Sequence, residues 1–251
     1  MPPNDRASRR ELVVASYNVH RCCGADRVCA PERIAEVLRR LDADVVALQE
    51  VDSTLPEHGA DQLAMLSRAV GAAAIAGPTL LLHRAAYGNA LLLRDLPVLA
   101  VRRHDLSVAG AEPRGAIDVE LDVGGAAVRV VGTHLGLKRR ERATQARWLL
   151  EALDGWTGPT VLLGDCNEWL PGTSARKILD RRFGRVRLGP SFPAGRPFVS
   201  LDRIWVDPAS AVIDAAVEGT ATARVASDHL PVRARLDVAA LVEPARALGS
   251  P

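Results

Sequence analysis

Hydrophobic and polar residues alternate over short runs along the chain, and turn residues separate these runs. Alternation with a period of two is typical of β-strands that have one covered face. Runs of this kind lie at 12–18, 44–50, 88–94, 96–106, 115–123, 126–135, 160–165, 201–206 and 230–238. Gly124 and Gly125 separate two of these runs and supply the positive φ of tight hairpin turns, so a hairpin is predicted there.

Helical periodicity occupies several of the segments between the strands. Residues 31–43 begin with proline, a favoured first residue of helices, and place apolar residues on one helical face. Residues 61–70 and 138–155 are also amphipathic, and the second of these segments ends at glycine, as helices often do. A shorter helix is predicted at 173–183.

The order of these elements predicts one domain that is built from two similar halves. A strand–helix–strand unit at 12–50 is repeated at 126–165, and no linker-like or low-complexity segment divides the chain. We therefore expect two sheets packed face to face, with helices outside them. The predicted domain covers residues 11–240, with a disordered N-terminal tail at 1–10 and a C-terminal tail at 241–251.

Composition and charge are ordinary for a globular protein, and the net charge of +2 gives no general affinity for nucleic acid or anionic membranes. Arginine clusters at 138–147 and 180–187 are predicted to be solvated helix faces, and anion capture becomes the better interpretation only if a site lies beside them. No apolar run is long enough to span a bilayer, and no signal-peptide hydrophobic region follows the polar N-terminus. We therefore expect a cytoplasmic protein.

The cysteines are Cys22, Cys23, Cys29 and Cys166. They fit no disulfide framework in a chain of this size, and the adjacent pair lacks zinc-site spacing, so we expect reduced thiols, which suit the cytoplasm. Cys166 stands between Asp165 and Asn167 at a strand end. In extended chain these two polar residues point to one face and the thiol to the other, so Cys166 is expected to pack in the core.

Several predicted strands end in residues that can carry out chemistry. These residues are Asn18, Glu50, His134, Asp165, Asn167, Asp202, Asp228 and His229. A single Asp or Asn at such a place is usually a turn former, because its side chain bonds to nearby backbone. A whole series of strands that end only in Asn, Asp, Glu or His is difficult to attribute to turns, and it indicates a functional site.

In this order, from SYNVH at 16–20 to SDHLPV at 227–232, the motifs resemble those of the endonuclease/exonuclease/phosphatase superfamily, in a small bacterial-type member. This superfamily contains metal-dependent phosphoesterases: DNase I-like enzymes, exonuclease III-like repair nucleases, neutral sphingomyelinases and inositol polyphosphate phosphatases. The resemblance implies a DNase I-like fold of the α/β class. That fold is a four-layer α/β/β/α sandwich of two packed mixed or antiparallel sheets flanked by helices.

The resemblance also implies a metal site. Glu50 would be the principal ligand, with Asn18 beside it and Asp228 completing the site, for one or two Mg²⁺ ions or for Mn²⁺. Mg²⁺ prefers oxygen ligands and is commonly held by one or two carboxylates. Asp165 and Asn167 would align the attacking water and the phosphate oxygens.

By the same resemblance, His229 is the catalytic histidine and Asp202 fixes its tautomer through a hydrogen bond. Whether His229 removes a proton from water or binds phosphate as imidazolium is left open. His134 would donate to a phosphate oxygen.

Further phosphate contacts are expected from Arg114, His20 and Arg21. Arg114 has a planar guanidinium suited to phosphate, and a surface ion pair with Glu112 is the alternative. His20 and Arg21 follow the Asn18 motif closely enough to line the site.

The predicted activity is that of a phosphodiesterase that uses one-step attack by an activated water. Its substrate would be a nucleic acid, a phospholipid head group or a small phosphodiester, and no specific protein partner is implied. The alternatives are a DNA endonuclease or exonuclease, a phospholipid or inositol-phosphate phosphoesterase, and an inactive binding module on the same fold. The low aromatic content gives no evident base-stacking platform, and no exposed apolar loop for a lipid surface stands out.

Overall fold

Two six-stranded sheets form the centre of the structure, a computed structural model that describes residues 10–54, 61–82, 85–169 and 174–243. In spatial order, the first sheet contains β11 (Val212–Val217), β12 (Val232–Asp237), β1 (Glu11–Asn18), β2 (Val45–Thr54), β4 (Ala85–Leu93) and β3 (Ala73–Leu82). The second contains β5 (Val98–Asp105), β6 (Gly115–Val123), β7 (Ala126–His134), β8 (Thr160–Asp165), β10 (Asp202–Asp207) and β9 (Gly184–Arg185).

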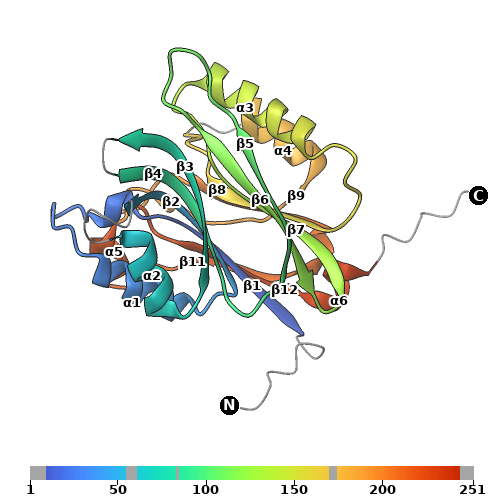
Figure 1. The fold of residues 1–251 in the computed structure, drawn as a ribbon, viewed down its shortest axis with the longest axis horizontal. Coiled ribbons are helices and arrows are strands. Elements are labelled where there is room, and N and C mark those ends of the chain that lie inside the picture. Colours follow the sequence, from blue (N-terminus) through green and yellow to red (C-terminus); the bar gives the residue numbers. More distant parts are fainter. Residues whose placement is uncertain (1–9, 55–60, 83–84, 170–173, 244–251) are drawn as a thin grey trace, which may run out of the picture.

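Helices cover the outer faces of both sheets. The first sheet carries α1 (Pro31–Leu41) and α2 (Gln62–Val70), and the second carries α3 (Arg139–Ala152) and α4 (Ser174–Arg182) (Figure 1). This arrangement confirms the predicted four-layer α/β/β/α sandwich. The short elements are η2 (His20–Cys22), η3 (Ala209–Ala211), α5 (Ala223–Ala226) and α6 (Val238–Val242).

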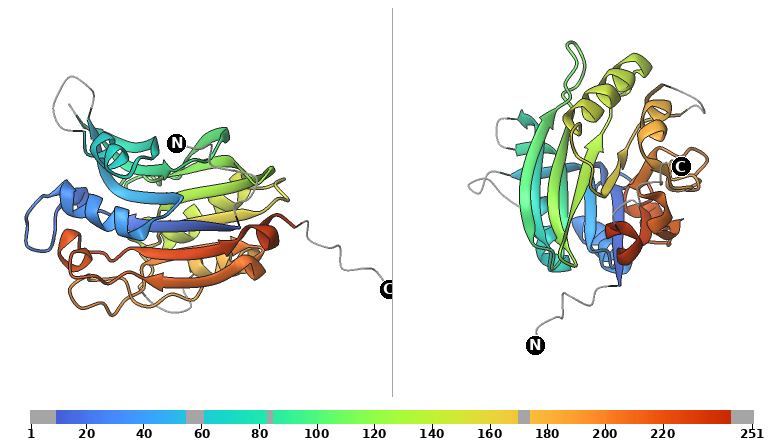
Figure 2. Two further views of the ribbon diagram at one scale, coloured as in Figure 1. Left: turned by 90° about the horizontal axis from the view of Figure 1, so that it is seen from below. Right: turned by 90° about the vertical axis from the view of Figure 1, so that its right-hand side faces the viewer.

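The two halves repeat one another, as the order of elements predicts. In the first sheet, β1 and β2 are parallel and α1 connects them; in the second, β7 and β8 are parallel and α3 connects them. Strand β1 lies between β2 and β12 (Figure 2). Because parallel strands end at the same edge of a sheet, each pair delivers its last residues to one place: Asn18 lies opposite Gln49, and His134 lies opposite Asp165.

Strand alternation distributes the apolar side chains among three layers. Leu12 and Val14 of β1 face the second sheet in the central layer, whereas Ala15 and Tyr17 face α1 and α2. The side chains of the second sheet alternate in the same way. Leu163 of β8 lies in the central layer, whereas Leu162 faces α3 and α4. All three layers consist of buried residues and give the strands their fixed register.

The hairpin prediction at Gly124 and Gly125 is confirmed. Their φ angles are +63° and +87°, and β6 pairs with β7 up to Val123 and Ala126. Strand β3 was not predicted, because its alanine-rich sequence does not alternate and contains Pro78. This proline lies at a register shift in an edge strand, a position where a missing N–H is tolerated.

The prediction of four reduced cysteines is wrong for Cys23 and Cys29, which form a disulfide. Sequence reasoning considered a framework for the whole chain, whereas this bond closes one loop after η2 with a sequence separation of 6. The turn brings the two Cα atoms to 3.9 Å, within an isolated antiparallel bridge. Cys22 and Cys166 are free and buried, and Cys166 packs in the layer below α3 and α4, as predicted.

Within the described residues, no helix has the length and apolar character needed to cross a membrane. The predicted N-terminal tail lies outside the described residues except for Arg10, and the C-terminal tail lies outside them after residue 243. Helix α6 runs to Val242, two residues beyond the predicted domain end at 240.

A buried ion pair lies between the second sheet and α3. The Arg129 guanidinium donates from Nε to Asp118 Oδ1 at 2.8 Å, and His104 Nε2 lies 2.8 Å from Asp118 Oδ2. Burial raises the pKa of Asp118, but the hydrogen bonds from Arg129 and His104 outweigh it, so the pKa lies below its ordinary value. Because the folded pKa is lowered, Asp118 contributes stability above the unfolded pKa and loses it as the pH falls through the folded pKa.

We expect Arg129→Met to lower the free energy of unfolding at pH 7 by about 3–5 kcal/mol, because it leaves a buried carboxylate without its main partner. The measurement is urea unfolding of both proteins. The difference between the two free energies of unfolding should narrow as the pH falls from the raised pKa of the buried Asp118 in the variant to its lowered pKa in wild type.

Arg102→Met is the matched control, because Arg102 forms an exposed pair with Glu120 and such pairs contribute about 0–1 kcal/mol. Equal losses of stability in the two variants would contradict the assignment of Asp118–Arg129 as the structural pair.

Candidate active site

The predicted chemical residues of both sheets meet at one edge of the sandwich. Asn18 ends β1, His134 ends β7, Asp165 ends β8 and Asp202 begins β10. Each shares its strand face with residues of the central layer, so each side chain points into the space between the sheets. His229 lies between α5 and β12 and is buried beside them.

The Asn18 amide joins the two sheets. Its Nδ2 donates to Glu50 Oε1 at 2.9 Å and to Asp165 Oδ2 at 3.0 Å. Its Oδ1 accepts from the backbone N–H of His20 at 3.0 Å. Both donor hydrogens therefore bind carboxylates, one from each half of the molecule.

Asp165 and Asn167 are held by their own loop and by β7. The Asn167 backbone N–H donates to Asp165 Oδ1 at 2.8 Å, and Asn167 Nδ2 donates to the Leu135 carbonyl at 2.9 Å. Gly164 permits this approach, because a Cβ there would lie 1.9 Å from the Thr133 carbonyl oxygen. The glycine of the GDCN motif thus brings β8 against β7 directly before Asp165.

His134 is neutral, and each of its ring nitrogens faces a side-chain nitrogen. Arg114 Nη1 lies 3.0 Å from His134 Nδ1, and Asn167 Nδ2 lies 3.0 Å from His134 Nε2. His134 Nε2 also lies 3.4 Å from Asp165 Oδ2. Burial lowers the pKa of His134 to about 3. The charge of Asp165 opposes this shift, and the charge of Arg114 adds to it.

His229 and Asp202 form a buried pair. His229 Nδ1 lies 2.9 Å from Asp202 Oδ2, and its Nε2 lies 3.7 Å from Asp165 Oδ2. Burial lowers the pKa of His229, but the charges of Asp202 and Asp165 outweigh it and raise the pKa to about 10. His229 is thus an imidazolium at neutral pH, with Nδ1–H bound to Asp202 and Nε2–H directed into the site.

Ser191 and Phe192 are parts of the site that sequence reasoning missed. Ser191 Oγ donates to Asp202 Oδ2 at 2.5 Å, and the Phe192 ring centroid lies 4.9 Å from that of His229. Both lie in a loop outside the predicted strands, between β9 and β10. One serine and one phenylalanine among prolines and glycines carry no spacing signal that would have identified them.

Glu50 and Asn167 occupy unusual backbone conformations. Their φ angles are +56° and +49°, in the left-handed region that residues other than glycine seldom adopt. Glu50 lies within the register shift of β2 between Leu48 and Val51, where β2 leaves the regular ladder with β4. Such strain persists where surrounding contacts fix it, and it is concentrated at functional sites.

The remaining predicted phosphate ligands lie around this centre. His20 Nδ1 lies 3.7 Å from Asp228 Oδ1, and Arg21 pairs with Asp52 at 3.0 Å. Arg114 is buried and pairs with Glu112 at 3.2 Å while it contacts His134, so the ion pair and the contact with the site coexist.

The family model that describes the Endonuclease/Exonuclease/phosphatase family matches residues 15–229, the segment that supplies all of these side chains. The chain belongs to the endonuclease/exonuclease/phosphatase family. The predicted superfamily is therefore confirmed.

Individual proteins of similar sequence or structure agree with this family. Protein YbhP of Escherichia coli (strain K12) is 30% identical over 254 residues, which cover 92% of this chain and 98% of YbhP. An endonuclease/exonuclease/phosphatase from Beutenbergia cavernae DSM 12333 is 26% identical, with a TM-score of 0.76 over 91% of this chain and 72% of that one. The mannosyl-6-phosphatase Bt3783 of Bacteroides thetaiotaomicron VPI-5482 has a TM-score of 0.72 over 89% of this chain and 98% of that one, and at 20% identity this likeness shows the fold alone.

Members of this family typically depend on a divalent metal, and the site has oxygen ligands for one. Burial raises the pKa of Asp228, and the charge of Glu50 adds to this despite the opposing imidazoles of His229 and His20. The carboxylates of Asp228 and Glu50 repel one another where Asp228 is largely buried. A hard cation bound between them would offset this repulsion.

A second group, Asp165, Asp202 and His229, has ligand atoms that all lie within 4.8 Å of one another, a spacing that can also hold a metal. Asp202 and His229 of this group are also hydrogen-bonded to one another, through Oδ2 and Nδ1.

Replacing Asp202 with asparagine should lower the pKa of His229 from about 10 toward the ordinary histidine value, because the nearest negative charge is removed while burial remains. The measurement is NMR titration of the imidazole in protein treated with EDTA.

Since the folded pKa is raised, His229 stabilises the wild-type fold below the unfolded pKa, and this contribution is lost as the pH rises toward 10. Glu120→Gln, on the far side of the second sheet, serves as the control. An unchanged His229 titration in Asp202→Asn would show that Asp202 does not hold the imidazolium.

Proposed function

We propose that the chain is a Mg²⁺- or Mn²⁺-dependent phosphodiesterase in which water attacks phosphorus in a single step. Family membership supports phosphoester hydrolysis, and the metal dependence and the preference for diesters are our proposals. The observation that carries them is the buried set in which Asp202 holds the His229 imidazolium against Asp165, while Asn18 ties Asp165 to Glu50.

Glu50 and Asp228 would hold the metal, with Asn18 beside them. When bound, the ion would neutralise charge on the phosphate oxygens and polarise the ester. The Asn18 amide oxygen already accepts from His20 N–H, and its nitrogen faces the carboxylates, so we assign Asn18 the positioning of Glu50 and Asp165 as well. Its role as a direct ligand stays a prediction, as does the choice between one ion and two.

Asp165 and Asn167 would orient the attacking water. Asp165 Oδ2 lies near the Nε2 atoms of both His134 and His229, at 3.4 and 3.7 Å. A water held by this carboxylate would therefore lie beside both imidazole rings. The neutral His134 would donate to a nonbridging phosphate oxygen without adding a charge.

For His229 the structure favours phosphate binding over proton abstraction. An imidazolium whose Nδ1–H is bound to Asp202 has no free lone pair with which to act as a base. It can donate from Nε2 to a phosphate oxygen and stabilise the charge that develops in the transition state. Asp202, fixed in turn by Ser191, keeps the ring in that orientation.

The contacts of His20, Arg21 and Arg114 define their proposed roles. Arg114 acts through its contact with His134, and His20 and Arg21 lie at the more exposed side of the site, where a substrate phosphate would enter. The inactive-module alternative is disfavoured, because a scaffold has no need for this buried, mutually bonded set.

Cytoplasmic location stays a prediction, and the Cys23–Cys29 disulfide removes the argument that rested on reduced thiols.

With bis(p-nitrophenyl) phosphate as substrate, we expect turnover that requires Mg²⁺ or Mn²⁺ and is abolished by EDTA. His229→Ala should lower kcat by about 10²–10⁴-fold, the usual contribution of a positioned histidine. Glu50→Gln should raise the Mg²⁺ concentration needed for half-maximal rate, because it removes a charged ligand.

Glu120→Gln is the control, since it removes one carboxylate from the opposite face of the second sheet. Activity that survives both His229→Ala and Glu50→Gln would refute the assignment. A faster rate with the monoester p-nitrophenyl phosphate than with the diester would refute the diester preference.

A further inference from the structure

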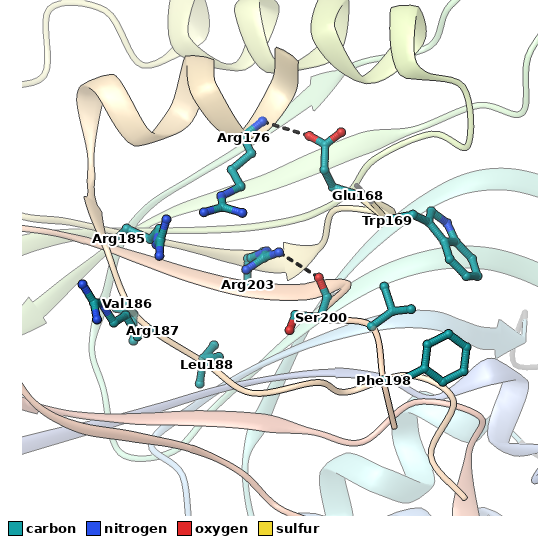
Figure 3. A pocket seen from close by; sticks show the side chains of 11 residues that line it. Glu168, Trp169, Arg176, Arg185, Val186, Arg187, Leu188, Phe198, Ser200 and Arg203 are labelled. Atoms are coloured by element: carbon teal, nitrogen blue, oxygen red, sulfur yellow. Dashed lines mark hydrogen bonds between the residues drawn. The ribbon is translucent and has the colours of Figure 1, made fainter. Parts of the chain in front are cut away.

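A cavity of about 410 Å³ lies beside the active site, at the edge where the end of β8, α4, β9 and β10 meet. Arginines from four different positions line it together with two aromatic rings: Arg176, Arg185, Arg187, Arg203, Trp169 and Phe198. Figure 3 shows Arg176 and Arg203 extending into the same space, with Trp169 and Phe198 together at the opposite side.

Positive charge in this cavity exceeds the negative charge that could neutralise it. Within the described residues, Arg185 and Arg187 form no ion pair, and Arg203 makes one hydrogen bond, from Nη2 to the Ser200 carbonyl at 2.9 Å. The Nε of Arg203 is buried without a partner. An unsatisfied buried N–H costs free energy unless a ligand accepts from it.

The carboxylates nearby are already bound elsewhere. Glu168 accepts from the side chain of Arg142 at 3.3 Å and from the backbone N–H of Arg176 at 2.9 Å. Asp180 accepts from Arg176 Nε at 3.3 Å and from Trp205 Nε1 at 2.8 Å. The cavity therefore presents guanidinium groups whose charge is left for an anion from outside.

Two contacts connect the cavity to the active site. The Trp169 ring packs edge-on against Phe192 at 5.5 Å, and Phe192 contacts His229 at 4.9 Å. On β10, Arg203 directly follows Asp202, and the two side chains lie on opposite faces of the strand. Trp169 and Phe192 thus connect His229 to the cavity through a chain of ring contacts.

The aromatic rings at the mouth are free to take a ligand. Trp169 is 50% exposed and Phe198 is 70% exposed, although large apolar side chains are normally covered. No stacking platform was evident from the sequence, because these two residues lie 29 positions apart, in loops, and meet only in the fold. Stacking of a ring on such side chains is favourable and tolerates different ring chemistries.

We propose that this cavity binds a second, non-reacting phosphate group of the substrate, and that the ring carrying this phosphate packs against Trp169 and Phe198. The proposal rests on the proposed function, because the reacting phosphoester is placed at His229. Guanidinium groups bind phosphate through paired N–H donors, which explains why arginine and no lysine lines the cavity. The substrate class is thus a phosphoester with a further phosphate on a ring, as in a nucleotide unit or a phosphorylated sugar.

The test is direct binding, measured by calorimetry with EDTA present so that turnover plays no part. The probes are adenosine 3′,5′-bisphosphate, glucose 1,6-bisphosphate and pyrophosphate. We expect the double variant Arg185→Gln/Arg187→Gln to bind the preferred bisphosphate at least about 10-fold more weakly than wild type, since each charged hydrogen bond is worth a severalfold change in affinity. Arg39→Gln/Arg68→Gln, which removes the same charge from exposed positions on α1 and α2, should bind as wild type does.

A second pair of variants tests the rings. Trp169→Leu and Phe198→Ala should weaken the binding of the ring-bearing probes and leave pyrophosphate unaffected. Tighter binding of the adenosine probe would identify a nucleotide unit, and tighter binding of the glucose probe would identify a sugar phosphate; either supports the proposal.

Equal affinity in wild type and Arg185→Gln/Arg187→Gln would overturn the phosphate site. Unchanged affinity for the ring-bearing probes in both aromatic variants would overturn the stacking. Because binding is measured without catalysis, these outcomes are separate from those of the proposed function. Arginine-dependent binding in a protein that hydrolyses no phosphodiester would leave the cavity assigned and refute the activity alone.

Discussion

The site depends on one amide. Asn18 Nδ2 donates to Glu50 of the first sheet and to Asp165 of the second, so it sets the distance between two carboxylates that would otherwise repel one another. This contact requires that β1 and β8 end at the same edge of the sandwich, and the parallel pairs β1–β2 and β7–β8 ensure that they do. The packing of the two sheets on their common apolar layer is therefore also what assembles the chemistry.

Around this contact, each buried charge has a defined partner. Asp202 is bound by Ser191 and His229, and the two histidines differ because their neighbours differ: burial, aided by the charge of Arg114, keeps His134 neutral, whereas Asp202 keeps His229 charged. The same carboxylate thus lies a few ångströms from one neutral and one cationic imidazole. Burial alone would have made both neutral.

Sequence reasoning could predict the layers, because they follow from periodicity, and it could predict that the polar residues at the strand ends lie together. The strands with clear alternation and the glycine hairpin are confirmed, and the polar residues that end them do converge. It could not predict what depends on contacts between distant segments. Ser191 reaches Asp202 from an irregular loop, the register shift that turns Glu50 leaves no mark in the sequence, and Cys23 pairs with Cys29 because of a local turn. Arg185 and Arg187 are exposed, as expected, and only the folded chain shows that they also line a cavity together with Arg203.

Strand alternation explains how one short strand can serve both the active site and this cavity. In β10, Asp202 shares its face with Ile204 and Val206 of the central layer, whereas Arg203 shares its face with Trp205 under α3 and α4. Adjacent residues of opposite charge are thereby separated by the sheet itself, so Asp202 orients His229 while the Arg203 charge stays available on the other side. Had both side chains lain on one face, they would have formed an ion pair, and His229 would have lost the carboxylate that keeps it protonated. The period of two that first identified β10 as a strand is thus also what keeps its two charges apart.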